Sequence, residues 1–122
     1  MATSSVTLGY PSGTKLFSDT DNTGTAVGVA SASSTIYEIE VDNSANAAAS
    51  YTKLWNTASG GVTIGTTAPD MILYLAASAS KVFVFPAGLV FGTAITLATV
   101  TTAGTAGTTN PTSDVIVRIV YA

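Results

Sequence analysis

Short segments in which apolar and polar residues alternate recur along this chain, and they constrain the fold more than any other feature. The segment Ser34–Asp42 reads STIYEIEVD, so Tyr37, Ile39 and Val41 fall on one face and two glutamates fall on the other. Alternation with a period of two is typical of a strand that buries one face. By contrast, we find no stretch of ten or more residues with helical periodicity and a capped start.

Five further segments are expected to be strands, because they are rich in β-branched and aromatic residues and are bounded by Gly, Pro and Ser. They are residues 50–56, 71–76, 81–86, 94–101 and 114–121. The segments 71–76 and 81–86 are apolar on both faces, so we expect them to be covered on both sides. Several short strands at close spacing, without crossover helices, predict an all-β, antiparallel sandwich or barrel.

The first 25 residues differ from the rest, since they are rich in Ser, Thr and Gly with isolated apolar points at Leu16 and Phe17. We therefore divide the chain into an extended N-terminal arm or edge segment, residues 1–25, and a β-sandwich domain, residues 26–122. A chain of 122 residues is long enough for one modest core.

Charged residues make up only 9% of the chain, whereas ordinary soluble domains carry roughly 25%. Low charge promotes association, so we expect much of the surface to be covered in a homo-oligomer. The net charge is −3 and the four basic residues are scattered, which argues against a nucleic-acid partner. No segment reaches the roughly 18 apolar residues of a membrane span, so no membrane partner is expected either.

Catalytic chemistry finds little support in the sequence, which contains no Cys and no His. Ser and Thr therefore lack their usual activating base, and no Gly-x-Ser-x-Gly or phosphate-loop motif is present. Glu38 and Glu40 share a strand face at roughly 7 Å, a spacing compatible with glycosidase carboxylates. Such carboxylates flank a cleft, however, so a solvated face or a salt bridge is the favoured interpretation. We expect no enzyme, no catalytic residue and no cofactor.

Residues 18–24 resemble a calcium loop, since Asp19, Asp21 and Gly24 fall at the first, third and sixth positions of the EF-hand pattern. The twelfth position is Ala30, so the bidentate carboxylate is missing, and no helices flank the loop. A polar turn without metal is the favoured interpretation.

Tyr51 and Trp55 lie on one face of the expected strand 50–56. An aromatic pair of this kind anchors a core or an interface more often than it forms a carbohydrate-stacking platform. The candidate interface residues are therefore Leu16, Phe17, Tyr51 and Trp55.

Two loops share a pattern, because Gly65 and Gly107 each begin a Gly-Thr-Thr-x-Pro sequence that leads to an Asp and an apolar strand. The repeat is either a pair of equivalent corners in two sheets or shared turn chemistry, and we favour the second interpretation.

The stretch 36–121 resembles small structural proteins of tailed bacteriophages. The resemblance rests on three motifs, which are VDNSAN before an aromatic strand that ends KLW, GTTAPD before the next strand, and FPAGLVF. It implies a β-sandwich, jelly-roll-like subunit on the virion, and within that class a capsid decoration (cement) protein that forms trimers on the outer head surface. The major capsid protein would be its partner, and no site residue is carried over.

A tail-fibre or receptor-binding module that recognises a host glycan is the alternative function, and a carbohydrate-active enzyme is a third. The chain begins with Met1 and ends directly after an expected strand, which favours a stand-alone subunit over a fibre module.

Overall fold

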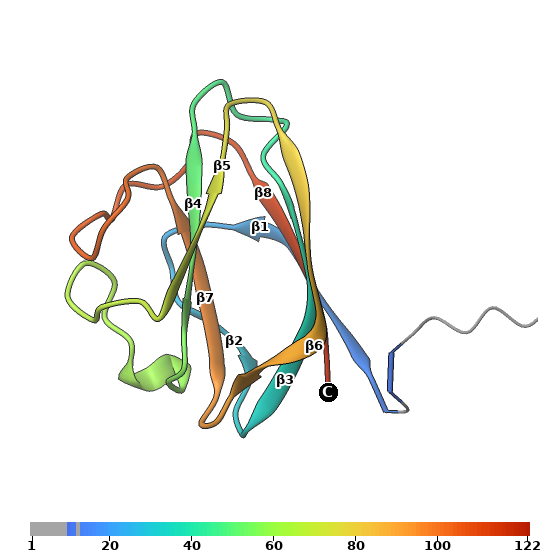
Figure 1. The fold of residues 1–122 in the computed structure, drawn as a ribbon. Coiled ribbons are helices and arrows are strands. Elements are labelled where there is room, and N and C mark those ends of the chain that lie inside the picture. Colours follow the sequence, from blue (N-terminus) through green and yellow to red (C-terminus); the bar gives the residue numbers. More distant parts are fainter. Residues whose placement is uncertain (1–9, 12) are drawn as a thin grey trace, which may run out of the picture.

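The computed structural model describes residues 10–11 and 13–122, and these form an antiparallel β-sandwich (Figure 1). The prediction of an all-β, antiparallel sandwich is therefore confirmed. Its elements are β1 (Lys15–Asn22), β2 (Val27–Ala30), β3 (Ser34–Asp42), β4 (Ser50–Trp55), the 3-10 turn η1 (Ser59–Gly61), β5 (Met71–Leu75), β6 (Ser80–Phe91), β7 (Ile95–Val100) and β8 (Val115–Tyr121). Within this part of the chain, no helix is long and apolar enough to cross a membrane.

The eight strands divide into two four-stranded sheets with a nested order. Sheet A has the order β1-β8-β3-β6, and sheet B has the order β2-β7-β4-β5. The first strand pairs with the last, the second with the seventh, the third with the sixth and the fourth with the fifth, all antiparallel. The chain is thus arranged like one long hairpin that has been wrapped into two layers.

The core lies between the two sheets and is built by the alternation expected of strands. Val115, Val117 and Ile119 of β8 are fully buried, as the pattern of residues 114–121 predicts. In β3 the alternation is interrupted, because the register shifts between Ile36 and Glu38. Ile36 therefore joins the core, whereas the predicted core residue Tyr37 is only half-buried.

β1 arises from the segment that was expected to be an arm or an edge element. Residues 15–22 form an edge strand of sheet A, paired with β8. Residues 1–9 and 12 of the expected arm lie outside the described residues, and Tyr10 donates a hydrogen bond to Glu38 of β3. β2, which sequence patterns do not predict, is the edge strand of sheet B next to β7.

β5 and β6 differ from the expectation that both of their faces are covered. Each is the last strand of its sheet, and each leaves one apolar face exposed. Ile72 and Tyr74 project outward from β5, and Val82 and Val84 project outward from β6. The expectation was wrong because an apolar residue on each face of a strand does not reveal whether a second layer covers it.

Candidate functional site

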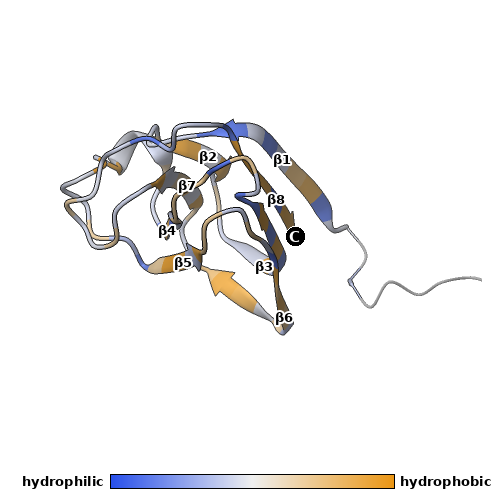
Figure 2. Cartoon of the chain, turned by 90° about the horizontal axis from the view of Figure 1, so that it is seen from above, coloured by the Kyte–Doolittle hydropathy of each residue, from blue (hydrophilic) through white to orange (hydrophobic). Residues whose placement is uncertain are grey.

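The largest group of exposed apolar side chains lies on β5 and β6. Five of the six large apolar side chains that are exposed in the described chain belong to these two strands. They are Ile72 (39% exposed) and Tyr74 (50%) on the outer face of sheet B, and Val82 (55%), Val84 (56%) and Val90 (68%) on the outer face of sheet A, and we call them together the β5–β6 surface. Figure 2 shows the hydrophobic colouring along both strands. Lys81 is the one charged residue within β5 and β6, but Glu38 and Glu40 of β3 lie directly opposite Val84 and Val82.

An aromatic pair lies beside the β5–β6 surface on the outer face of sheet B. Tyr51 of β4 is directly opposite Tyr74 of β5, and their ring centroids are 5.5 Å apart at an interplanar angle of 50°. Tyr51 is half-buried and Tyr74 is half-exposed, so the pair presents a partly accessible aromatic face.

The other predicted interface residues lie apart from this surface. Leu16, on the edge strand β1, is 65% exposed, and Phe17 next to it packs against the core and is half-buried. Trp55 is only 1% exposed, and its Nε1–H donates to the carbonyl oxygen of Thr67 at 3.0 Å. This corrects the expectation that Trp55 lies at an interface, because the chain's own loop covers the indole.

Two long loops cover the outer face of sheet B, and Lys53 is buried beneath one of them. Since Leu54 points into the core, Lys53 points to the opposite face of β4. Lys53 is 1% exposed, and its ammonium donates to the carbonyl oxygens of Gly104 and Gly107, the second at 3.1 Å. Burial lowers the pKa of Lys53. No sequence pattern marks this contact, because the loop is about fifty residues away in the chain.

The two loops with the shared Gly-Thr-Thr-x-Pro pattern lie side by side. Gly65 has a φ of 89°, and a Cβ built on it would be 2.6 Å from Cγ2 of Thr108. Figure 1 shows the two loops on the same side of the molecule. Together they cover Lys53 and Trp55, whose side chains donate hydrogen bonds to carbonyl oxygens of the two loops.

The acidic turn of residues 18–24 is organised by hydrogen bonds within the chain. Asp19 accepts bonds from the backbone N–H of Asp21 at 3.1 Å and from Nδ2 of Asn22 at 2.9 Å. The hydrogen bond and the charge of Asp19 raise the pKa of Asp21. The described residues contain no group of three acidic, His or Cys side chains that could hold a metal ion. Asn22 is buried, and its Oδ1 has no partner among the described atoms.

The glutamate pair on β3 makes separate contacts. Glu40 forms a salt bridge with Arg118 at 3.3 Å, and Glu38 accepts a hydrogen bond from the hydroxyl of Tyr10. Both partners lie within the chain, and they leave the two carboxyl groups on a sheet face rather than across a cleft.

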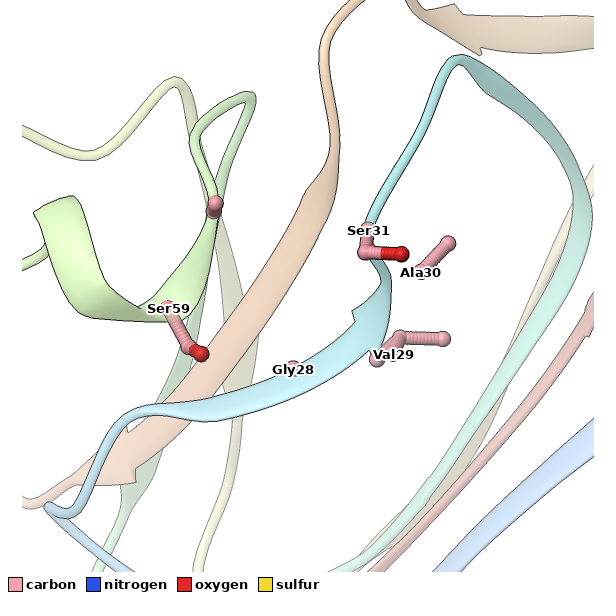
Figure 3. A pocket seen from close by; sticks show the side chains of 6 residues that line it. Gly28, Val29, Ala30, Ser31 and Ser59 are labelled. Atoms are coloured by element: carbon pink, nitrogen blue, oxygen red, sulfur yellow. The ribbon is translucent and has the colours of Figure 1, made fainter.

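Two hollows flank the short edge strand β2, with volumes of about 270 and 360 Å³. Both include Val29, Ala30 and Ser31. Figure 3 shows the first hollow, where the hydroxyl of Ser59 lies close to Gly28. Lys15 is the only charged side chain among the described residues that line either hollow. Small and hydroxyl residues of this kind supply no paired acid and base, so the hollows offer no recognisable reaction chemistry.

Comparison with protein-family models, with curated proteins and with solved structures finds no match to this chain.

Proposed function

We propose that this chain is a bacteriophage capsid decoration (cement) protein, which binds the outer head surface and stabilises the shell through subunit contacts. The observation that carries the proposal is the β5–β6 surface. Exposed apolar side chains on edge strands are typical of protein–protein contact sites. Burial of these apolar side chains against a partner is favoured over permanent exposure to water.

The strand order supports a jelly-roll assignment for the sandwich. A jelly roll has eight strands in two sheets, and its paired strands are nested as they are here. Viral capsid domains use this architecture, but lectins and cupins use it as well. The order is therefore consistent with a virion role, while the exposed surface supplies the functional argument.

The proposed mechanism is mechanical. Apolar side chains of the β5–β6 surface would be removed from water against the major capsid protein, at a gain of about 25 cal/mol per Å² of apolar area. Many weak contacts repeated over a shell would resist its expansion or rupture without any catalytic step.

Binding to capsids tests the proposal. Expanded capsids stripped of accessory proteins are mixed with the purified chain and sedimented, and we expect the chain to sediment with the capsids. Val90→Asp places a charge on the most exposed valine of the surface and should reduce binding by about tenfold or more. Thr112→Asp, on an exposed loop outside β5 and β6, is the matched control and should bind like the wild type. Failure of the wild-type chain to sediment would contradict the proposal.

A receptor-binding module of a tail fibre is the second candidate, and the Tyr51–Tyr74 pair is the observation that favours it. Aromatic faces that are partly exposed can stack on sugar rings. The sequence suggested Tyr51 and Trp55 as such an aromatic pair, whereas in the structure Tyr51 pairs with Tyr74. Binding of the wild-type chain to host-surface glycans, lost in Tyr74→Ala, would support this candidate over capsid decoration.

A further inference from the structure

The free edge of β1 carries a regular five-residue segment whose sequence is self-complementary. β1 is the end strand of sheet A, and Figure 2 shows it along the margin of the molecule with no described strand beyond it. Its pairing with β8 is regular from Lys15 to Asp19, beyond which the register shifts. The segment reads KLFSD, so a positive and a negative charge lie at equal distances on either side of Phe17. A strand with this pattern matches an antiparallel copy of itself.

In the antiparallel register centred on Phe17, the two copies match in chemistry. Phe17 lies opposite Phe17 of the second copy, and Lys15 lies opposite Asp19 in both halves of the contact. Aromatic pairs and opposite charges are among the cross-strand pairs that stabilise a sheet. Asp19 and Asp21 both follow Phe17, so the acidic residues of the two copies lie on opposite sides of the centre and do not face each other.

Lys15 and Asp19 both have capacity for an ion pair between copies. Lys15 is exposed, with its ammonium 6.0 Å from the centroid of the Tyr121 ring, and the one salt bridge in the described part of the chain joins Arg118 to Glu40. Each carboxylate oxygen of Asp19 accepts one hydrogen bond within the chain. Since a carboxylate oxygen has about two acceptor sites, each can accept one more.

Leu16 gives independent support. It is 65% exposed, and it is the one exposed large apolar side chain of the described residues that does not belong to the β5–β6 surface. Because Phe17 packs against the core, Leu16 points to the outer face of sheet A. In this register Leu16 lies diagonally across from Leu16 of the second copy, at roughly 7–8 Å, which is within reach of long side chains. The contact would therefore remove from water an apolar side chain that the fold itself leaves exposed.

The other edge of sheet A fits a second copy less well. β6 pairs regularly with β3 from Ser80 to Val84, and Lys81 is its one charged residue. Two copies of β6 therefore bring no opposite charges together. Pairing β1 with β6 can set Lys81 opposite Asp19, but Lys15 is then left without an acidic partner. That arrangement forms one ion pair where the self-complementary register forms two.

We propose that β1 of one copy pairs antiparallel with β1 of a second copy in the register centred on Phe17, so that sheet A runs continuously through two subunits. The contact is isologous, so two copies complete it. β6 is the opposite edge of sheet A and β5 belongs to sheet B, so the β5–β6 surface stays accessible. The inference goes beyond the proposed function, because it concerns a different surface and holds whether or not the chain binds capsids.

Disulfide crosslinking of the full chain tests the register, because the chain has no native Cys. Phe17→Cys places one thiol in each copy directly opposite the other, with Cα atoms about 5 Å apart, which is within the range for a disulfide. We expect a covalent dimer on a non-reducing gel.

Thr20→Cys is the matched control, since Thr20 is exposed on the same strand but lies three residues from the centre of the register. The two thiols would be about 20 Å apart along the ladder, so this variant should stay uncrosslinked. Folding of each variant is checked by circular dichroism. Equal crosslinking of the two variants, or none of Phe17→Cys in a folded protein, would overturn the register.

Self-association of chains without Cys, measured by light scattering, gives a second readout. We expect the mass of the wild type to rise from 12.2 kDa toward twice that value as its concentration approaches about 1 mM. Lys15→Glu sets like charges opposite each other in both halves of the contact, so it should raise the concentration needed for dimerisation by about tenfold or more. Lys81→Glu, at an exposed lysine on the opposite edge, is the matched control and should leave that concentration unchanged.

The outcomes separate this contact from its alternatives. A wild-type chain that stays monomeric overturns the inference, and so does a mass of three chains, which is the trimer that the resemblance implies. A larger effect of Lys81→Glu than of Lys15→Glu would assign the contact to β6 and overturn it as well. A dimer that does not sediment with capsids refutes the decoration role alone, whereas capsid binding by a chain that stays monomeric refutes the subunit contact alone.

Discussion

Thr52 and Thr99 form a hydrogen-bonded pair in the core whose worth can be measured directly. They lie opposite each other on β4 and β7, neither has exposed surface, and their Oγ1 atoms are 2.8 Å apart. Thr52→Val keeps the shape of the side chain but leaves the hydroxyl of Thr99 without this partner. An unsatisfied buried hydroxyl costs about 1–3 kcal/mol, so we expect a loss of about 2 kcal/mol in the free energy of unfolding.

The double substitution should behave differently. Two independent losses would add to about 4 kcal/mol, whereas replacing both hydroxyls removes both unsatisfied groups and should leave the protein within about 1 kcal/mol of the wild type. The coupling energy is then about 3 kcal/mol. Urea denaturation of the wild type, both single variants and the double variant, at one protein concentration, measures it. Additive losses would refute the assignment of the two hydroxyls as each other's partners, and Thr112→Val on the surface is the control.

Three further predictions concern buried polar groups and backbone approach. Burial lowers the pKa of Lys53 below its usual 10.5, so the unfolded chain binds more protons than the folded chain in the alkaline range. The free energy of unfolding should therefore rise with pH between about pH 8 and 10.5. In urea denaturation, Lys53→Met should abolish this rise. Asn43→Ala removes two bonds donated to backbone carbonyls and one accepted from a serine, and should lower the unfolding free energy by about 2–4 kcal/mol. Gly107→Ala should lower the melting temperature by several degrees, because its Cβ would lie 2.3 Å from the carbonyl oxygen of Thr102, whereas Gly60→Ala, with open space around it, should not.

The strands that could be predicted are those whose own residues alternate or are rich in β-branched and aromatic residues. The predicted bounds of Ser34–Asp42 match β3, although the register shift near Tyr37 brings Ile36 rather than Tyr37 into the core. β1 (KLFSDTDN) is mostly polar and β2 (VGVA) is only four residues long, and their strand conformation is set by pairing with β8 and β7. Such pairing is a tertiary effect that local propensity does not reveal.

The candidate site was predictable only in part for the same reason. Leu16 is exposed on an edge strand, in keeping with an interface role, but Trp55 has the same aromatic character as Tyr51 and is covered by a loop. Whether an apolar residue on the outer face of a sheet is covered depends on where distant loops lie. For the same reason, the side chains of the β5–β6 surface were expected to be buried although they are exposed.

The nested pairing of strands has a consequence for how the chain is made. Lys15 pairs with Tyr121, so the first strand cannot find its partner until residue 121 has been synthesised. Among the paired strands, β4 and β5 can meet early, since they are close in sequence. Folding of the sandwich is therefore expected to be slow, as is usual when distant segments have to meet. Until β8 has been synthesised, β1 has no partner strand. Productive folding therefore depends on the encounter of β1 with β8 rather than on local strand formation.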